Sequence, residues 1–335
     1  KMKKIKIALI GTGYIANYHI LGLKKLPEVD IVAVVSSQLN NARKFAKKYK
    51  IEKAYSSISP IIADVSVHGV IISTPNFLHA SYAIDFLKNN KDVFIEKPMA
   101  INTEEAKKIS LTAKKTNQLV MVGHMWRFDD EVNFLRKTIK EEKLGKIFKT
   151  KGYGIHENWG PSGWFLKKDL AGGGALADMG IHAIDTIRYI LGDPNPVQIF
   201  AKIANNFGDY DVDDTGIVLI TWDNGTDSLI ESGWWQPHRD GPEASCGIFG
   251  TKGYANLFPT FLKFKNAADS KQIHPKFSAK TEHCDQVLYD RQMDYFIDCI
   301  KQRKQPSPGL KEGLVSFQVI DAAYASAKKS TVINL

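Results

Sequence analysis

The first part of the chain alternates between short apolar runs and segments whose apolar residues recur at helical spacing. Apolar runs at Ile5–Ile10 and at residues 31–35, 69–73 and 119–122 are rich in β-branched residues, which is typical of buried strands. Segments such as Thr103–Thr116 separate these runs and have the spacing of a helix with one buried face. This alternation predicts an α/β fold that begins with a Rossmann unit, a doubly wound parallel sheet.

The pattern changes after Gly123. A helix is expected at Asp130–Lys140, and longer strand-like runs follow it. These runs cover residues 146–154, 197–203, 216–222 and 228–235. Asp223-Asn224-Gly225 is a hairpin turn signal between the last two. We therefore predict two domains, residues 1–123 and 124–335, the second being α+β with a largely antiparallel sheet.

Composition and charge narrow the class of protein. The formal charge of +9 comes from lysines spread through amphipathic segments, such as residues 44–50, so solvated helix faces are favoured over a nucleic-acid patch. A mild attraction for anionic ligands stays open. No apolar run approaches the roughly 20 residues that span a bilayer. The cysteines Cys246, Cys284 and Cys299 have no paired spacing, which indicates a reducing compartment. We expect a cytoplasmic protein without a membrane or nucleic-acid partner.

A glycine motif directly follows the first strand. Gly11-Thr12-Gly13-Tyr14-Ile15-Ala16 has the G-x-G-x-x-A spacing of a dinucleotide-binding turn and opens a predicted helix. Gly11 would permit the tight turn, Gly13 would let the backbone approach a pyrophosphate, and Ala16 would let the helix pack closely. The free N–H groups of the helix N-terminus would bind the phosphates. The alternative is a glycine turn without a ligand. The expected cofactor contacts here are Gly11, Thr12, Gly13, Tyr14 and Ile15.

The end of the second strand bears on the choice between NAD and NADP. A fold that prefers NAD usually has Asp or Glu here to bind the ribose 2′-hydroxyl, whereas this chain has Ser36-Ser37-Gln38. Hydroxyl and amide groups, with Arg43 nearby, would accept a 2′-phosphate without charge repulsion. Ser36 and Ser37 are therefore expected to contact the cofactor, with NADP slightly favoured over NAD. The alternative is an ordinary turn, with Arg43 on a solvated helix.

Two further strand ends carry polar residues. Thr74-Pro75-Asn76, with His79 three residues later, lies where the sugar and nicotinamide of a cofactor would pass, although helix capping alone also explains these residues. Glu96-Lys97-Pro98 ends a buried apolar run. A lysine at such an end can sit close to a reacting oxygen, and burial can lower its pKa. The alternative is a solvated Glu–Lys pair. Thr74, Pro75, Asn76, His79, Glu96 and Lys97 complete the expected cofactor contacts.

A second chemical cluster follows the glycine triplet at residues 172–174. Asp178 and His182 are four residues apart in a predicted helix that extends to about Leu191, so they would share one face. An aspartate can orient a histidine that exchanges protons near neutral pH. A lone histidine is more often a core residue, and Asp185 is expected to be a structural hydrogen-bond partner. A metal site is disfavoured because no further ligand cluster accompanies these residues.

Aromatic residues lie near this cluster in the sequence. They are His156, Trp159, Trp164, Trp234 and Trp235. Such faces stack against sugar rings, but they also build cores and subunit interfaces. For each one taken individually, the core or an interface is the favoured location.

Together these motifs resemble the glucose–fructose oxidoreductase and inositol dehydrogenase family, written Gfo/Idh/MocA, over nearly the whole chain. The resemblance rests on four motifs and one single residue. They are Gly11-x-Gly13-x-x-Ala16, Thr74-Pro75-Asn76-x-x-His79, Glu96-Lys97-Pro98, Arg127 and Gly173-Gly174-x-x-x-Asp178-x-Gly180-x-His182. It implies NAD(P)-dependent transfer of a hydride to or from a hydroxyl or carbonyl carbon of a sugar, cyclitol or related polyol. It also implies that residues 124–335 bind substrate and form a homodimer or homotetramer through an open C-terminal sheet.

The resemblance implies a role for individual residues. Lys97 would hydrogen-bond the reacting oxygen, His182 would be the general acid and base, and Asp178 would bind substrate and support His182. The expected substrate contacts are Lys97, Arg127, His156, Trp164, Asp178 and His182. Two alternatives stay open: a glycosidase-type relative that retains NAD, and a dinucleotide-binding regulatory protein. A regulator would be expected to lack Lys97, Asp178 or His182, and all three are present.

Overall fold

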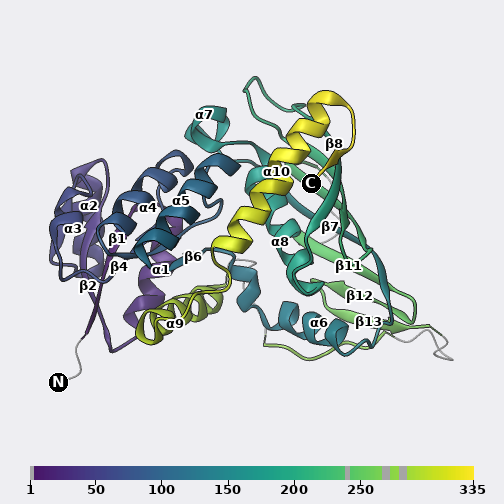
Figure 1. The fold of residues 1–335 in the computed structure, drawn as a ribbon, viewed down its shortest axis with the longest axis horizontal. Coiled ribbons are helices and arrows are strands. Elements are labelled where there is room, and N and C mark those ends of the chain that lie inside the picture. The colour runs from purple at the N-terminus through teal and green to yellow at the C-terminus, as the bar shows by residue number, and fades with distance from the viewer. Residues whose placement is uncertain (1–3, 238–241, 266–271, 279–284) are drawn as a thin grey trace. The chain divides into compact units, whose positions relative to one another are not determined.

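The computed structural model describes residues 4–237, 242–265, 272–278 and 285–335 (Figure 1). Contacts divide the chain into two units, each with its own sheet. Lys1–Met125 and Cys284–Leu314 form the first unit, and Trp126–His283 with Val315–Leu335 forms the second. This division differs from a single boundary after residue 123, because a late segment of the chain joins the first unit. Cys284 lies outside the described residues.

The first unit contains the predicted doubly wound parallel sheet. The strand order is β3-β2-β1-β4-β5-β6, and every pairing is parallel. The strands are β1 (Ile5–Ile10), β2 (Val29–Val35), β3 (Lys53–Tyr55), β4 (Gly69–Ile72), β5 (Asp92–Ile95) and β6 (Val120–Val122). The residues of β4, β5 and β6 are buried throughout, which is why these strands are apolar apart from Asp92 and do not alternate. The carboxyl ends of all six strands therefore meet at one edge.

Most helices of this unit connect one strand to the next, and one late helix joins the unit from a distant part of the chain. These helices are α1 (Tyr14–Lys24), α2 (Leu39–Tyr49), α3 (Ser59–Ala63), the 3₁₀ turn η1 (Asn76–Leu78), α4 (His79–Lys88), α5 (Thr103–Thr116) and α9 (Gln286–Gln302). The late helix α9 packs on α1 so closely that a Cβ on Gly22 would lie 3.1 Å from the carbonyl oxygen of Tyr289. Asn102 caps α5 by accepting a hydrogen bond from the Glu105 N–H.

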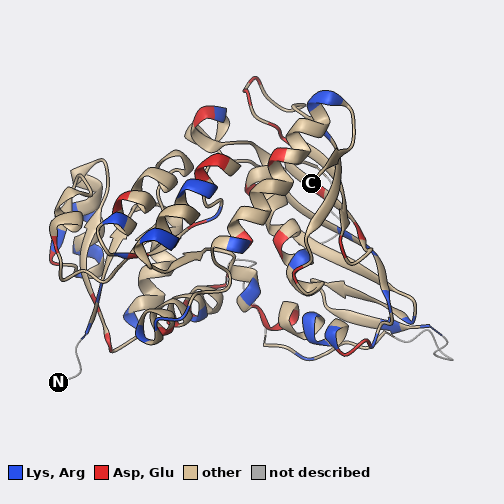
Figure 2. Cartoon of the chain, viewed as in Figure 1, with Lys and Arg blue, Asp and Glu red and all other residues tan. Residues whose placement is uncertain are grey.

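The lysines of helices α2 and α5 lie on solvated faces, as the sequence predicted. On α5, Ala106 and Ile109 are buried, whereas Lys107 and Lys108 are exposed. Lys108 pairs with Glu104 one turn earlier at 2.7 Å. Figure 2 shows the same mixture of blue and red along this helix. The basic charge of this surface is thus interspersed with acidic residues.

The second unit is built on an eight-stranded sheet with the order β13-β12-β11-β7-β10-β9-β8-β14. Its strands are β7 (Ile147–Glu157), β8 (Pro196–Ala204), β9 (Thr215–Trp222), β10 (Asp227–Gln236), β11 (Ala244–Gly250), β12 (Gly253–Leu257), β13 (Phe261–Phe264) and β14 (Ile333–Asn334). Only the β7–β10 pairing is parallel among these, which confirms the largely antiparallel sheet.

Helices α8 and α10 lie against one face of this sheet (Figure 1). The elements of the second part of the chain are η2 (Met125–Phe128), α6 (Asp130–Lys140), η3 (Gly163–Leu166), α7 (Lys168–Ala171), the π turn η4 (Leu176–Gly180), α8 (Ile181–Ile190) and α10 (Leu310–Lys329). The covered face buries Val218 and Ile220 of β9, whereas Ile217 and Leu219 on the other face are 49% and 44% exposed. None of the described helices has the length and apolar character needed to cross a membrane.

Candidate active site

The glycine turn after β1 has the geometry that a dinucleotide site requires. Gly11 has φ = +113°, and a Cβ there would lie 2.5 Å from the Ser73 carbonyl oxygen, so both conformation and space demand glycine. Gly13 is different, because a Cβ there would meet no atom within 4 Å. Gly13 is also the N-cap of α1 and has no side chain to cap it, which leaves the first N–H groups of the helix for an anionic ligand. Ala16 is fully buried, as close helix packing requires.

The other residues of the glycine turn are at least partly exposed. Thr12 and Ile15 are half-buried, and the Tyr14 side chain is 67% exposed. At the end of β2, the Ser36 N–H donates to the carbonyl oxygen of Tyr55, while the Ser37 side chain is exposed. These residues and the glycine turn lie at the carboxyl ends of neighbouring strands, so the sheet brings them to one edge.

The loop after β4 is fixed by a buried histidine. Both ring nitrogens of His79 lie 2.8 Å from a backbone oxygen, Nδ1 from that of Pro98 and Nε2 from that of Thr74. Burial lowers the pKa of His79 below its ordinary value of 6.5, while the hydrogen bonds to the Pro98 and Thr74 oxygens act in the opposite direction. His79 is 1% exposed and joins the loops after β4 and β5 from inside. Thr74 and Pro75 are half-buried, and Asn76 is buried at the start of η1.

The Glu96-Lys97-Pro98 segment follows β5 directly. Glu96 is nearly buried, and its Oε2 accepts a hydrogen bond of 3.1 Å from the Lys97 N–H. Its Oε1 lies 2.6 Å from Nε2 of His19, a fully buried residue of α1. Lys97 itself is half-buried. Sequence reasoning missed His19, because no motif marks it and its partner is 77 positions away.

In the second unit, Asp178 and His182 belong to two kinds of helix. The sequence predicted one continuous helix, but Asp178 lies in the π turn η4 and His182 in the first turn of α8. Asp178 Oδ2 accepts a hydrogen bond of 3.1 Å from the indole N–H of Trp234. The His182 ring is 5.1 Å from that of Trp126 between centroids, and the residue is 8% exposed. Single-turn π segments are frequent at functional sites.

His156 extends this cluster. Its Nε2 lies 3.9 Å from Asp178 Oδ2, and its Nδ1 lies 3.1 Å from Oε1 of Glu243. The ring stacks on Trp159 with 3.6 Å between centroids, and the indole N–H of Trp159 donates to the same Glu243 oxygen. Glu243 has no counterpart among the predicted site residues. Its position in a loop ahead of β11 carried no motif that could have indicated it.

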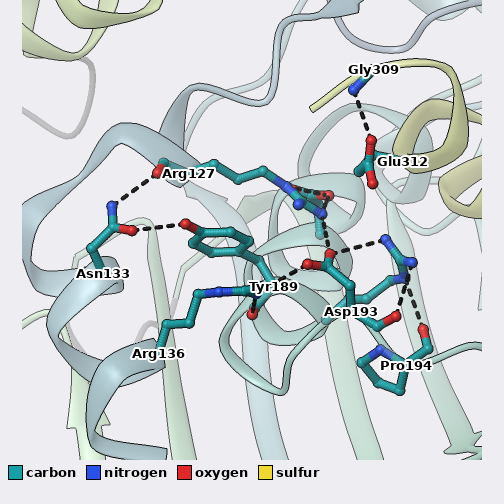
Figure 3. Close-up of polar contacts among 10 residues, drawn as sticks. Arg127, Asn133, Arg136, Tyr189, Asp193, Pro194, Gly309 and Glu312 are labelled. Carbon is teal, nitrogen blue, oxygen red and sulfur yellow. Dashed lines mark hydrogen bonds and ion pairs between the residues drawn. The ribbon is translucent and has the colours of Figure 1, made fainter. Parts of the chain in front are cut away.

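Arg127 lies inside the second unit and makes a bidentate ion pair. Its Nε and Nη2 donate to the Asp185 carboxylate at 2.7–3.1 Å, and Nη2 also lies 2.9 Å from Asp193 Oδ1. Arg136 reaches the other oxygen of Asp193 and stacks on Tyr189 (Figure 3). Asp185 therefore has the structural role that the sequence predicted. Arg127, expected at the substrate, is 5% exposed and binds α8 to the segment that precedes α6.

Three features of the second unit remain, namely Trp164, the possibility of a metal site, and a cavity near the glycine triplet. Trp164 is half-buried in η3 and stacks on Phe165. Within the described ranges, no group of three or more His, Cys, Asp or Glu side chains is arranged to hold a metal ion. A cavity of about 290 Å³ lies beside the glycine triplet, where Gly173, Tyr210, Asp213 and Tyr324 line it. Its lining includes none of the predicted catalytic residues.

A parallel Rossmann sheet with an open glycine turn, joined to a second unit with a mostly antiparallel sheet, defines a dinucleotide-binding oxidoreductase. Residues 5–124 match the model of the oxidoreductase family with an NAD-binding Rossmann fold, and residues 132–256 match the GFO/IDH/MocA C-terminal domain. The chain belongs to the Gfo/Idh/MocA family of oxidoreductases.

Similar proteins cover nearly the whole chain. D-glucoside 3-dehydrogenase of Escherichia coli (strain K12) is 26% identical over 99% of this chain and 97% of its own. The scyllo-inositol 2-dehydrogenase (NAD(+)) of Bacillus subtilis (strain 168) is 26% identical over 99% and 96%. A solved structure of levoglucosan dehydrogenase in complex with NADH has a TM-score of 0.89 at 23% identity and covers 99% of both chains. That likeness extends the agreement to the fold of both units.

Proposed function

We propose that the protein is an NAD(P)-dependent dehydrogenase or reductase that acts on a CH–OH group of a sugar, cyclitol or related polyol. The names of the similar dehydrogenases support this substrate class. One observation carries the proposal for this chain: Lys97 follows β5 at the edge of the sheet where Gly13 leaves its helix N-terminus open. A dinucleotide bound at that edge would extend along the strand ends toward the lysine.

The proposed mechanism assigns one task to each polar group. When bound, the nicotinamide supplies or accepts the hydride. The Lys97 ammonium hydrogen-bonds the reacting oxygen and stabilises the negative charge that builds on it during reduction. His182 gives a proton to that oxygen in reduction and removes it in oxidation. Asp178 binds a substrate hydroxyl and supports His182, and His156 lies beside Asp178 as a further hydrogen-bonding group.

Arg127 and His79 are proposed to act indirectly, whereas Trp164 keeps its predicted role. Arg127 is proposed to hold α8, and with it His182, in place through its bidentate bond to Asp185. Trp164, with its half-buried face, stays a proposed contact for the sugar ring. His79 is proposed to act on the cofactor site indirectly, by fixing the backbone at Thr74 and Pro98.

For the cofactor, we propose that the end of β2 accepts a ribose 2′-phosphate, so that NADP is used at least as well as NAD. The supporting features are the exposed Ser37 hydroxyl, the half-buried Ser36, the missing acid, and the exposed Arg43 on α2. The relative from B. subtilis carries NAD(+) in its name, so both cofactors have to be compared.

We also propose a homodimer or homotetramer in the cytoplasm, assembled through the open face of the second sheet. Ile217 and Leu219 support this assembly, because two exposed aliphatic side chains on the same face of β9 suit an interface. The buried free thiols Cys246 and Cys299 fit a reducing compartment.

The direct test is nicotinamide absorbance with NAD(H) and NADP(H) across a panel of inositols, aldoses, ketoses and anhydro-sugars. Turnover of a panel member that depends on Lys97 and His182 is the expected result. Silence across the whole panel, with cofactor binding demonstrated, would contradict the proposal and favour the glycosidase-type or regulatory alternative.

A further inference from the structure

The Glu96 carboxyl group connects two segments that have separate tasks. One of its oxygens, Oε2, accepts a hydrogen bond of 3.1 Å from the backbone N–H of Lys97. The other, Oε1, lies 2.6 Å from Nε2 of His19 on α1. The N-terminal N–H groups of this helix are the ones proposed to bind the cofactor. A carboxyl group is planar and rigid, so a shift at one oxygen moves the other. The two hydrogen bonds therefore join the backbone of Lys97 to α1.

Packing around the pair prevents both side chains from turning away. His19 is fully buried, and its ring packs edge-on against Phe94 and Tyr289 at 4.9 and 5.4 Å between centroids. On the opposite side, Gly123 leaves room for the carboxyl group. A Cβ at Gly123 would lie 2.9 Å from Glu96 Oε2. The site thus has one arrangement for Glu96.

The direction of the hydrogen bond follows from the second ring nitrogen. His19 Nδ1 is buried and has no hydrogen-bond partner in the described part of the chain. A buried N–H without an acceptor is costly, so the hydrogen is assigned to Nε2, which donates to Glu96. A glutamine can place an amide N–H near the position of Nε2, whereas phenylalanine fills the space without a donor.

We propose that His19 and Glu96 are positioning residues that set the place of Lys97 relative to α1 and its bound dinucleotide. The inference rests on the proposed role of Lys97. A buried polar pair is weak evidence for stability, since an apolar pair of the same volume often stabilises as well, so its use here is geometric. His79 holds the Pro98 carbonyl on the other side, so the backbone is tied on both sides of the lysine side chain.

The test compares His19→Phe with His19→Gln. For His19→Phe we expect kcat to fall by roughly tenfold to a hundredfold, because displacement of a catalytic group by about 1 Å costs up to about a hundredfold. Dissociation constants for NADH, from fluorescence titration, should change less than threefold, as roughly expected for a residue without ligand contact. His19→Gln should recover most of the lost kcat.

A second readout does not depend on turnover. Hydrogen–deuterium exchange of the peptide that contains the Lys97 amide should be faster in His19→Phe than in the wild type, and close to wild type in His19→Gln. The control His68→Phe removes a histidine of the same unit whose Nδ1 accepts from the Lys6 N–H. His68 directly precedes β4, so it lies at the amino end of that strand and away from the carboxyl ends where Lys97 lies. It should lower the melting temperature without changing kcat or exchange at Lys97.

Wild-type kcat in His19→Phe would overturn the inference, and so would equal losses of kcat in His19→Phe and His19→Gln. A loss of kcat in His68→Phe that matches its loss of melting temperature would also overturn it, because the effect of His19 would then be one of stability alone. If His19→Phe does not fold, Glu96→Gln decides, because its amide can accept only one of the two hydrogen bonds. If the wild type turns over no panel substrate, the proposed function fails. Exchange at Lys97 then still decides whether the linkage exists.

Discussion

At the scale of single residues, the chemistry proposed for this enzyme depends on two residues, each of which is held in place by neighbouring residues. Lys97 follows a strand that is buried throughout, and Glu96 receives its backbone N–H. His182 begins α8, and the indole of Trp126 packs beside its ring. Removal of either of these two proposed catalytic side chains should therefore leave the surrounding fold in place.

We expect Lys97→Ala and His182→Ala each to lower turnover at least roughly a hundredfold, the scale of general acid–base catalysis. Cofactor affinity and melting temperature should stay near those of the wild type. Steady-state kinetics with the best panel substrate provides the measurement, and Lys107→Ala on the exposed face of α5 serves as a control for loss of a lysine. Wild-type turnover in either variant would remove that residue from the mechanism.

The end of β2 gives a prediction about cofactor choice. An aspartate in Ser36→Asp would repel a 2′-phosphate and accept hydrogen bonds from a free ribose hydroxyl, so the ratio of NAD to NADP activity should rise at least about tenfold. The ratio of kcat/KM values with the two cofactors measures it. An unchanged ratio would mean that this strand end does not set selectivity.

The buried His79 predicts a pH dependence of stability. Its folded pKa is lowered, so below pH 6.5 the unfolded chain takes up a proton that the folded chain does not. The free energy of unfolding should fall with decreasing pH from 6.5 to the folded pKa, by at most about 1.4 kcal/mol per pH unit. Denaturant titrations at several pH values would show this slope. His79→Gln should reduce the slope, whereas His274→Gln, at an exposed histidine, should keep it.

At the scale of elements, the sequence predicted what is local or periodic. The alternation of apolar runs with helical segments predicted the parallel sheet, and the apolar runs in β4, β5 and β6 are buried as expected for such strands. Strands β11 to β13 were missed, since runs such as Ala244–Gly250 contain glycine and polar residues and lack a clear alternation. The contact between His19 and Glu96 could not be read at all, because periodicity carries no information about distant pairs.

The helix after the glycine triplet illustrates the same limit. Its existence, and the structural role of Asp185, follow from spacing and residue type. The π turn that carries Asp178 has no sequence signature, because it depends on how the chain packs against neighbours such as Trp234. Spacing alone therefore gave the motif residues but not their geometry.

The two glycines of the first turn form a matched pair for testing. Gly11→Ala should destabilise the protein by about 1–3 kcal/mol or more, because both its positive φ and the Ser73 oxygen oppose a Cβ. Gly13→Ala should leave the melting temperature nearly unchanged, since its Cβ would enter open space, yet weaken NADH binding roughly tenfold or more by occupying the approach to the pyrophosphate. Wild-type affinity in Gly13→Ala would contradict this placement of the cofactor.

At the scale of the whole molecule, the prediction concerns assembly. Leu219→Lys places a charge on the exposed face of the second sheet, and an interface there would have to bury it. We expect light scattering to show a smaller species than in the wild type. The control Leu111→Lys changes a 57% exposed leucine on α5 in the first unit. A wild-type mass for Leu219→Lys would argue against this face as the interface.

The first unit is discontinuous in sequence, and this has a consequence for its synthesis. Helix α9 covers α1, where Gln286 donates to the Tyr18 carbonyl and Lys25 pairs with Asp290, and the Val122 N–H donates to the carbonyl of Pro308. The nascent Rossmann sheet thus emerges from the ribosome long before the segment that completes it. Until about residue 308 has left the exit tunnel, the side of α1 that packs against α9 has no cover, so we expect chaperones to reach this surface while the second unit is being made. A fragment that ends at residue 125 would keep that exposed surface permanently.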